Sequence, residues 1–304
     1  MIGDIKRLLL IPHLKVHNAN ALSSPFTIGF PAMTAWLGAT HALQRKLNSK
    51  EFYGLRFVAT AVISHDFNLQ AHKGQGDYVR SIIIPKRPSF TKKELVKFNA
   101  GKAPTFIEEA RCHLDVSLLI EYTGVEKDEE SSFLAKVAHL LNSSMKIAGG
   151  DILSFSPPLA LKIEEGNEAD LRKLTRKLMP GYAIIERREL MLEAMKNGQD
   201  AMDALLDYLV IHHTCEQDDS GNVTWISKRK TAGWIVPIAT GFHGLTELGE
   251  AKNQRDENTP HRFAESIVTL GEFKMPHRIQ SINEIFWRYH VEQESNLYLC
   301  QQET

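Results

Sequence analysis

Apolar residues recur along the N-terminal half of the chain with two different periods. Four segments have the apolar runs or the strict alternation of β-strands, namely residues 8–16, 55–67, 111–122 and 151–163, the last interrupted by two prolines. Two further segments repeat apolar residues every three or four positions, as amphipathic helices do, namely residues 32–47 and 133–147. The order β-α-β-β-α-β is that of the split βαβ or ferredoxin-like plan, an α+β fold shared by RNA-recognition modules.

The segment between the second and third predicted strands, residues 72–104, has no core period, and we interpret it as an inserted arm. The whole chain has a net charge of −1, whereas this arm carries eight Lys or Arg against two acids, or +6. A local excess of this size is typical of a surface that binds phosphates. Lys86 and Arg87, which lie between Pro85 and Pro88, are its candidate RNA contacts.

The C-terminal part of the chain has a weaker pattern, which predicts an α+β extension. Helices are expected at residues 171–178, 186–197, 202–210, 261–270 and 282–290. Two short strands, residues 223–226 and 234–239, are expected to pair across the basic turn between them.

Composition places the chain among ordinary globular proteins, with 304 residues, 43% hydrophobic and 24% charged. No window has the length of a membrane span, and the N-terminus lacks the features of a secretory signal, so we expect a cytoplasmic protein without membrane contact. The three cysteines are widely spaced and odd in number, which favours reduced thiols. His212, His213 and Cys215 lack a second ligand pair at zinc spacing, so we expect neither a metal nor another cofactor.

A polar loop follows the first predicted strand and leads into the first predicted helix. It offers two amides, Asn18 and Asn20, and two hydroxyls, Ser23 and Ser24, beside the unpaired N–H groups of a helix N-terminus. These groups suit an anion or the edge of a nucleotide base. The alternative is that all four residues only shape a turn and cap the helix.

Further candidate RNA contacts are cations and aromatics on other elements. Arg111 and His113 lie on the polar face of the third strand, Arg172 and Arg176 share one helix face, and the basic turn holds Lys228 and Arg229 beside Trp234. For the turn, the alternative is that Trp225 and Trp234 are buried and the cations are merely solvated.

Histidines on the first and third strands open an enzymatic alternative. His13, His17 and His113 could supply a general acid and a general base for metal-free RNA cleavage. Strand histidines satisfied by packing or backbone contacts are commoner than catalytic ones.

Several segments together resemble one protein family. They are NANALSSP and GFP near the N-terminus, then EEARCHLDVSLL (108–119), MKIAGGDIL (145–153), LRKLTRKLMPG (171–181), GWIVPI (233–238), RDENTPHRFAES (255–266) and LGEFKMPHR (270–278). In this order they resemble the motifs of the Csy-type subunit of type I-F CRISPR surveillance complexes, the Cas-five-class member of the RAMP superfamily. The resemblance covers nearly the whole chain.

The resemblance implies a non-catalytic subunit that caps the 5′ handle of the CRISPR RNA at the tail of a type I-F Cascade. Its implied partners are a Cas-eight-class large subunit, which forms a heterodimer with it, a Cas-seven-class backbone subunit, and target DNA near the handle–spacer junction. The implied organisation is a ferredoxin-like palm (1–71 and 105–185), a basic thumb (72–104) and a C-terminal region packed on the palm (186–304). Lys146, Arg255 and Arg262 fall in the matching segments and join the candidate RNA contacts.

One position departs from the family pattern. The first strand of the family usually has a basic residue after its proline, where this chain has His13. A histidine carries little positive charge at neutral pH, so a phosphate contact there is expected to be weak. Three functions stay open: the RNA-capping subunit, a metal-independent endonuclease of the same superfamily, and a scaffold that touches only proteins.

Overall fold

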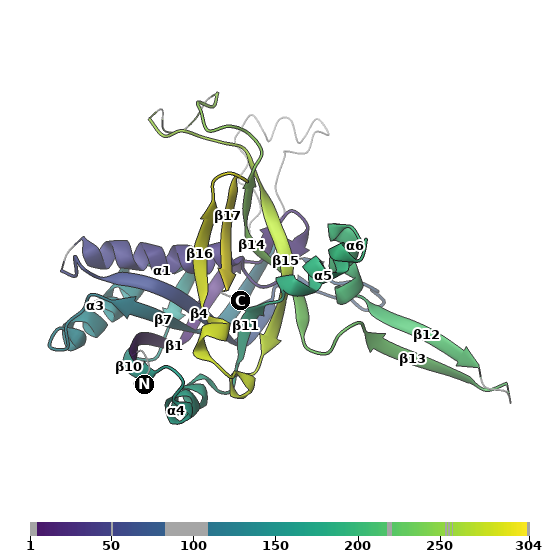
Figure 1. Cartoon of the computed structure of the whole chain (residues 1–304), viewed down its shortest axis with the longest axis horizontal. Helices are drawn as coiled ribbons and strands as arrows, with labels where there is room; N and C mark the ends of the chain where they lie inside the picture. The colour runs from purple at the N-terminus through teal and green to yellow at the C-terminus, as the bar shows by residue number, and fades with distance from the viewer. Residues whose placement is uncertain are drawn as a thin grey trace.

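The computed structural model describes residues 5–49, 51–82, 109–217, 221–252, 254, 256 and 258–302. Lys86, Arg87, most of the predicted arm and Arg255 lie outside these residues. Within them, eleven strands join in one large sheet, and five α-helices pack on it or beside it (Figure 1). The α+β class predicted from the sequence is confirmed.

The N-terminal part of the chain forms the predicted strands, the fourth of them as two separate strands, and the two predicted helices, followed by the helix expected at residues 171–178. Its elements are β1 (Ile5–Asn20), α1 (Met33–Asn48), β4 (Arg56–Leu69), β7 (Arg111–Thr123), α3 (Glu130–Ser143), β9 (Gly150–Ser154), β10 (Leu159–Glu164) and α4 (Glu168–Leu178). Neighbouring strands are antiparallel in the order β4–β7–β1, and β1 also pairs with β10 and β9. Pro157 and Pro158 separate β9 from β10, as predicted, because proline cannot donate to the ladder.

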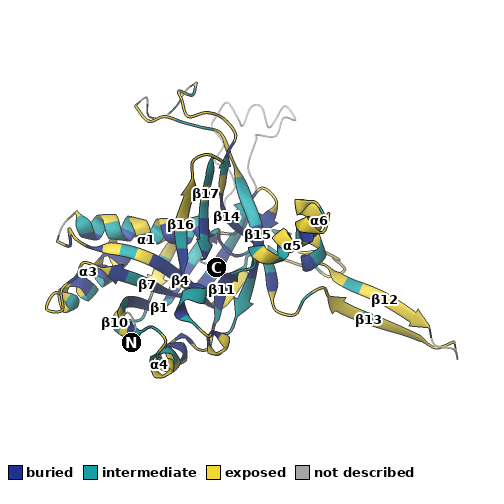
Figure 2. Ribbon diagram, viewed as in Figure 1, coloured by how far each residue is buried: buried dark blue, intermediate teal, exposed yellow. Residues whose placement is uncertain are grey.

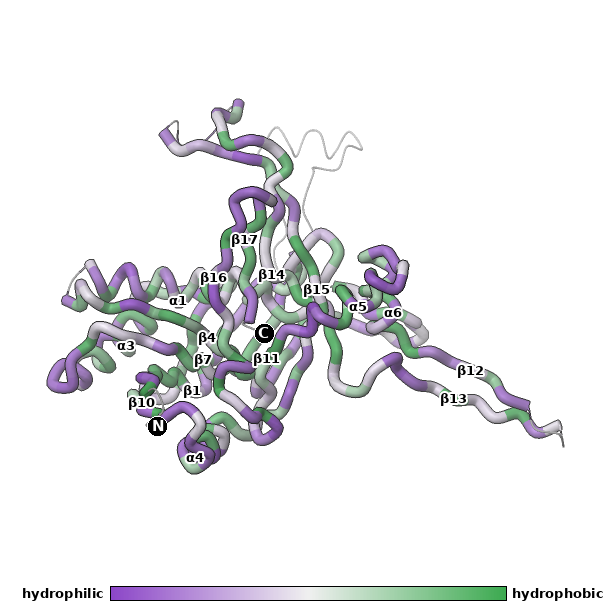
Figure 3. Tube along the Cα trace, viewed as in Figure 1, coloured by the Kyte–Doolittle hydropathy of each residue, from purple (hydrophilic) through white to green (hydrophobic). Residues whose placement is uncertain are grey.

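Both long helices of this half pack on the same face of the sheet. Trp36 of α1 and Phe133 of α3 are fully buried in one cluster with the inward residues of β1 and β7. The other face carries a second cluster beneath α4, which includes Leu119 and Leu178. Figure 3 shows the hydrophobic residues concentrated in these central strands.

The C-terminal strands extend the sheet from the free edge of β4. They are β11 (Tyr182–Glu186), β14 (Ile235–Gly244), β15 (Ala264–Lys274), β16 (Trp287–Glu292) and β17 (Leu297–Gln302), joined in the order β11–β15–β14–β17–β16–β4. Because β11 also pairs with β4, these six strands form a closed ring of pairings. Trp287 is buried within the main core and donates to the Ile184 carbonyl at 2.9 Å.

Smaller elements decorate this body. Helices α5 (Arg188–Lys196) and α6 (Ala201–Leu209) share a small core with β14 and β15. Short strands form three hairpins: β2 (Leu22–Ser24) with β3 (Thr27–Ile28), β5 (Ala71–His72) with β6 (Ser81–Ile82), and β8 (Lys146–Ile147) with β9. Two 3₁₀ turns, η1 (Pro276–Arg278) and η2 (Ile282–Ile285), precede β16. None of the helices within the described residues is both long and apolar enough to span a membrane.

One hairpin projects away from the body. It is made of β12 (Ile211–Gln217) and β13 (Val223–Arg229), which within the described part of the chain pair only with each other, and nearly all its residues are exposed (Figure 2). The predicted pairing of residues 223–226 with 234–239 is therefore wrong, because β13 pairs with β12 while β14 pairs with β15 and β17.

Four predicted helices need correction. Residues 261–270 contribute to strand β15, and residues 282–290 form the short turn η2 followed by strand β16. The apolar spacing resembles a helix period, but the β-branched run at 267–269 favours a strand between two sheet neighbours. Residues 186–197 give the end of β11 and then α5, and the helix predicted to reach residue 147 ends at Ser143, because Lys146 and Ile147 pair with β9.

Candidate nucleic-acid interface

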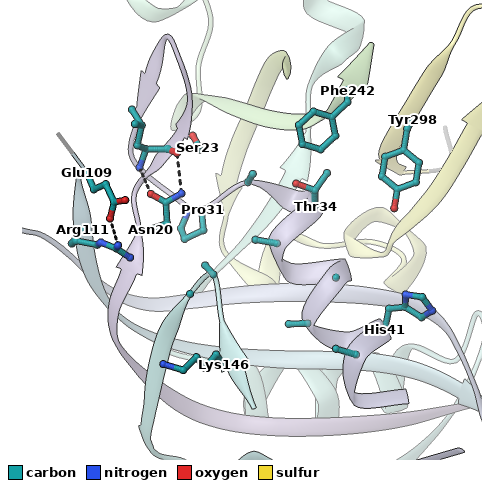
Figure 4. A pocket seen from close by; sticks show the side chains of 18 of the residues that line it. Asn20, Ser23, Pro31, Thr34, His41, Glu109, Arg111, Lys146, Phe242 and Tyr298 are labelled. Carbon is teal, nitrogen blue, oxygen red and sulfur yellow. Dashed lines mark hydrogen bonds and ion pairs between the residues drawn. The ribbon is translucent and has the colours of Figure 1, made fainter. Parts of the chain in front are cut away.

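An open groove of about 1020 Å³ runs along the exposed side of α1 (Figure 4). We call it the α1 groove. Small residues of α1 line it, including Ala35, Gly38, Ala39 and Ala42, whose spacing places them on one face of the helix. A floor without bulky side chains leaves room for a chain to lie along the helix.

One wall of the α1 groove gathers four of the residues predicted to contact RNA. Asn20 ends β1 and Ser23 lies in β2, so most of the segment predicted as the polar loop is strand. Arg111 comes from the start of β7, and Lys146 from β8 (Figure 4). Three separate chain segments thus bring two cations, an amide and a hydroxyl to one side of the helix. Charge for phosphates and polar groups for base edges therefore face the same space.

The two cations on this wall are positioned by different contacts. Arg111 forms an ion pair with Glu109 and donates to the Asn18 carbonyl at 3.3 Å. Lys146 pairs with Asp151 at 2.6 Å, and this hydrogen bond lowers the pKa of the Asp151 carboxyl. Because both partners of the Lys146 pair are largely exposed, the pair is weak, and a phosphate can compete for the ammonium group.

The opposite wall is aromatic. Phe242 of β14, Tyr289 of β16 and Tyr298 of β17 line it and are 41%, 40% and 38% exposed, which is high for such large side chains. The two tyrosine rings lie 5.5 Å apart. Burial raises the pKa of Tyr298 above its usual value. Exposed rings suit the stacking of unpaired bases, and the wall they face carries Arg111 and Lys146 together with Glu109.

Sequence analysis missed this aromatic wall. Its three residues come from three strands, two of which lie in a region predicted as helix and tail. The available signal was the pair of tyrosines near the C-terminus, which lie on the two strands of the last hairpin, because aromatic residues on strands are candidates for base stacking.

Hydrogen bonds within the polar loop leave fewer of its donors and acceptors available to a ligand. The Asn20 amide donates to the Leu22 carbonyl and accepts from the Leu22 N–H, both at 3.1 Å. Ser24 is buried and contacts the Thr27 hydroxyl at 2.7 Å, while Ser23 contacts the same hydroxyl at 2.9 Å. Asn20 keeps one N–H and one lone pair for a ligand. These residues therefore do shape the turn, as the alternative interpretation holds, but Asn20 can also bind a ligand.

Asn18 and His113 connect this loop to Arg111. Asn18 has φ 56° at a bulge in β1, and its N–H donates to His113 Nδ1 at 3.1 Å, while its carbonyl accepts from Arg111. His113 also stacks on His17, with ring centroids 3.9 Å apart. Burial first, and then His17, lowers the pKa of His113, which keeps Nδ1 available as an acceptor.

The remaining predicted contacts lie elsewhere on the molecule. Arg172 and Arg176 share the exposed face of α4, as predicted, and Arg172 pairs with Glu168. Lys228 and Arg229 lie on the projecting hairpin, where Arg229 donates to the Ile235 carbonyl. Arg262 donates to Asn296 in a different hollow. Trp225 and Trp234 are 69% and 52% exposed, so the alternative that both are buried is wrong.

A second cavity, of about 390 Å³, lies on the other side of the β2–β3 hairpin and shares Ser23 with the α1 groove. Aromatic rings dominate its lining, namely Phe30, Phe67, Tyr182, Trp234 and Phe273. Trp234 packs against Tyr182 and Phe273 with ring centroids 5.3 and 5.1 Å apart. Trp234 therefore contributes to an apolar pocket next to the polar loop.

Two groups of side chains in the described part of the chain contain possible metal ligands. His212 and His213 lie at successive positions of β12, where His212 contacts Asp207 and His213 contacts Ser227. Successive strand residues point to opposite faces, so these two histidines do not converge. His13, His65 and Asp115 do converge, with one potential ligand atom from each within 4.8 Å of the others.

Comparisons with known proteins agree with the resemblance seen in the sequence. Residues 9–300 match the sequence model of a family described as CRISPR-associated protein (Cas_Csy2). The protein called CRISPR-associated protein Csy2 from Pseudomonas aeruginosa (strain UCBPP-PA14) is 32% identical over 323 residues, which cover 98% of this chain and 95% of that relative. The match spans both the N-terminal strands and the C-terminal ring of strands. The chain therefore belongs to the Csy2 family of CRISPR-associated proteins.

Proposed function

We propose that the chain is a non-catalytic subunit of a type I-F Csy complex that binds CRISPR RNA and caps its 5′ handle. The α1 groove carries this proposal, because it places Arg111 and Lys146 opposite Phe242 and Tyr298 across a floor of small residues (Figure 4). A single RNA strand can direct its phosphates to one wall and its bases to the other. Family membership supplies the CRISPR context.

The N-terminal half supports a ferredoxin-like palm of the RAMP type. Its four main strands lie in the order β4–β7–β1–β10, all antiparallel, with α1 and α3 on one face. This is the order of the split βαβ plan. The proposed thumb spans residues 72–104, of which residues 83–104 lie outside the described part, so the roles of Lys86 and Arg87 stay predictions.

The partners follow from the same proposal. They are a Cas-eight-class large subunit, a Cas-seven-class backbone subunit, and target DNA near the handle–spacer junction. The projecting β12–β13 hairpin supports a protein partner, because an isolated hairpin is only marginally stable in water and this one exposes Trp225, Val223 and Ile211.

One observation favours keeping the endonuclease as a second candidate. His17 and His113 stack on the polar side of β1 and β7, and His113 has a lowered pKa. Metal-free RNA cleavage needs a general base and a general acid, and two neighbouring imidazoles can supply them. His13, the third histidine of that hypothesis, instead contacts Asp115 at 3.1 Å.

Labelled repeat-derived RNA separates the candidates. The purified chain is incubated with handle RNA and with a scrambled RNA, with and without EDTA, and both retention and strand length are measured. Tight retention of intact handle RNA in both conditions supports the capping subunit. Cleavage that disappears in a variant with His17→Ala and His113→Ala supports the endonuclease, and no retention of either RNA supports a protein-only scaffold.

A further inference from the structure

Three central strands bring two imidazoles and a carboxylate together at one point of the sheet. His13 lies on β1, His65 on β4, and Asp115 on β7 between them. His13 Nδ1 and Asp115 Oδ1 are 3.1 Å apart, and the two imidazole rings stack with centroids 4.3 Å apart. Two imidazoles with one carboxylate are a common donor set for zinc and other first-row divalent metals.

The backbone is irregular on both sides of Asp115. β1 has a register shift between Ile11 and Leu14, and β4 has one between Ser64 and Asp66, so each histidine sits in a bulge. His13 has φ 48°, a left-handed conformation that costs energy for a residue with a Cβ. Bulges redirect side chains and are frequent beside functional sites. These two direct the histidines toward the same carboxylate.

The groups around the cluster orient His65 as a ligand. His65 Nδ1 lies 2.5 Å from the Pro180 carbonyl, which only accepts, so Nδ1 carries the proton and Nε2 presents its lone pair. Metal-binding histidines almost always donate their second ring nitrogen to a carbonyl or carboxylate in this way. Nε2 faces the buried Ser117 hydroxyl at 2.6 Å, and Ser117 Oγ also accepts from the His13 N–H at 3.1 Å.

The cluster is open enough for an ion to enter. The His13 side chain is 44% exposed and the Asp115 side chain 21% exposed, so water reaches the ligand atoms from one side. In a tetrahedral zinc site the donor atoms stand about 3.3 Å apart, as ligand bonds of about 2.0–2.1 Å require. The His13–Asp115 distance already fits, whereas the His65 ligand atom lies within 4.8 Å of the other two and has to move closer when a metal binds.

We propose that His13 Nδ1, His65 Nε2 and an Asp115 carboxylate oxygen bind one zinc-like divalent cation, with water at the remaining position. On binding, the His13 proton moves from Nδ1 to Nε2, and the cation takes the place of the hydrogen bonds between His13 and Asp115 and between Ser117 and His65. The site is independent of the proposed RNA groove, which is built from other residues.

The neighbouring histidine pair provides a matched control. His17 and His113 also stack across β1 and β7, at 3.9 Å. The carboxylate in register with His17, that of Asp151, is held by Lys146 at 2.6 Å. Removing this pair deletes two imidazoles from the same face of the sheet and leaves the proposed ligands in place.

The test uses the full chain without a histidine tag, stripped with EDTA and then titrated with Zn²⁺ and, separately, Co²⁺. Binding is followed by calorimetry and by the visible absorption of four-coordinate Co²⁺. We expect one equivalent per chain for the wild type and for the His17→Ala, His113→Ala control. Asp115→Asn and His65→Ala are each expected to weaken binding on the order of a hundredfold.

Because Asp115 and His65 are partly buried, His13→Asn at the exposed ligand serves as a further variant, and circular dichroism checks that each variant folds. Substoichiometric binding by the wild type overturns the site, as does unchanged affinity in folded His13→Asn and Asp115→Asn. RNA retention in EDTA is measured in parallel, so loss of the metal site and loss of the RNA proposal are distinguished.

Discussion

The α1 groove and the exposed face of α4 both present cations, but they arrange them differently. The groove has Arg111 and Lys146 from two distant strands, whereas α4 carries four cations on one helix, namely Arg172, Lys173, Arg176 and Lys177. We call the second set the α4 ridge. The ridge has more charge, and all four of its cationic residues are exposed. Cations pair with acids in both places: Arg172 and Lys173 with Glu168 and Asp170 on the ridge, and Arg111 and Lys146 with Glu109 and Asp151 at the groove.

This difference shows that the number of cations on a surface and their convergence on one ligand are separate properties. The groove cations face a space that also holds Phe242 and Tyr298, so one ligand can meet charge and aromatic rings together. The ridge offers exposed charges to phosphates, an attraction that salt screens. We therefore expect affinity for the handle to depend mainly on the groove, with the ridge adding a smaller, sequence-independent part.

The largest expected effect comes from reversing the groove charges. Arg111→Glu with Lys146→Glu removes two charge-assisted contacts and should cost about 3 kcal/mol of binding free energy, more than about a hundredfold in affinity. Fluorescence anisotropy with labelled handle RNA at several salt concentrations measures both the affinity and its salt slope. An unchanged slope would mean that these cations do not meet phosphates.

Removing one ring from the aromatic wall should have the next largest effect. Phe242→Ala is expected to cost about 1–3 kcal/mol, the usual value for one base stacked on an aromatic side chain, without altering the salt slope. Phe263→Ala is a suitable control, because Phe263 is 71% exposed on the same C-terminal part and lies outside the groove lining. Equal losses in both variants would contradict the aromatic wall.

Charge removal on the α4 ridge should matter less. Arg172→Ala with Arg176→Ala should lower affinity for handle and scrambled RNA alike, by less than about 1 kcal/mol, and reduce the salt slope. The same anisotropy titrations measure it. A loss of affinity confined to the handle RNA would place sequence recognition on the ridge and contradict the expectation that handle binding depends mainly on the groove.

The smallest effect concerns pH. His113 holds Asn18, which in turn holds Arg111, and burial lowers the pKa of His113 below 6.5. The unfolded chain therefore binds more protons in this range, so stability falls as pH drops through about 6.5. His113→Asn keeps an acceptor for the Asn18 N–H and does not titrate. Its melting temperature should fall less than that of the wild type between about pH 7.5 and 5.5; an equal fall would assign the acid sensitivity to other groups.

Local signals explain which features the sequence could predict. The alternation in β7 places Arg111 and His113 on one face, and the helical period of α1 locates its buried side, because both patterns depend on near neighbours. The ring of C-terminal strands depends on pairings between distant segments, so β15 was mistaken for a helix. The aromatic wall was missed for the same reason, since Phe242 and Tyr298 meet only through the pairing of β14 with β17.

Photo-crosslinking tests the central claim most directly. Handle RNA carrying 4-thiouridine is bound to the chain in the complex with which it co-purifies, irradiated, and the crosslinked peptides are identified by mass spectrometry. We expect crosslinks to Phe242, Tyr289 or Tyr298, and their loss in the Arg111→Glu, Lys146→Glu variant. Crosslinks confined to α4 or to the β12–β13 hairpin would contradict it.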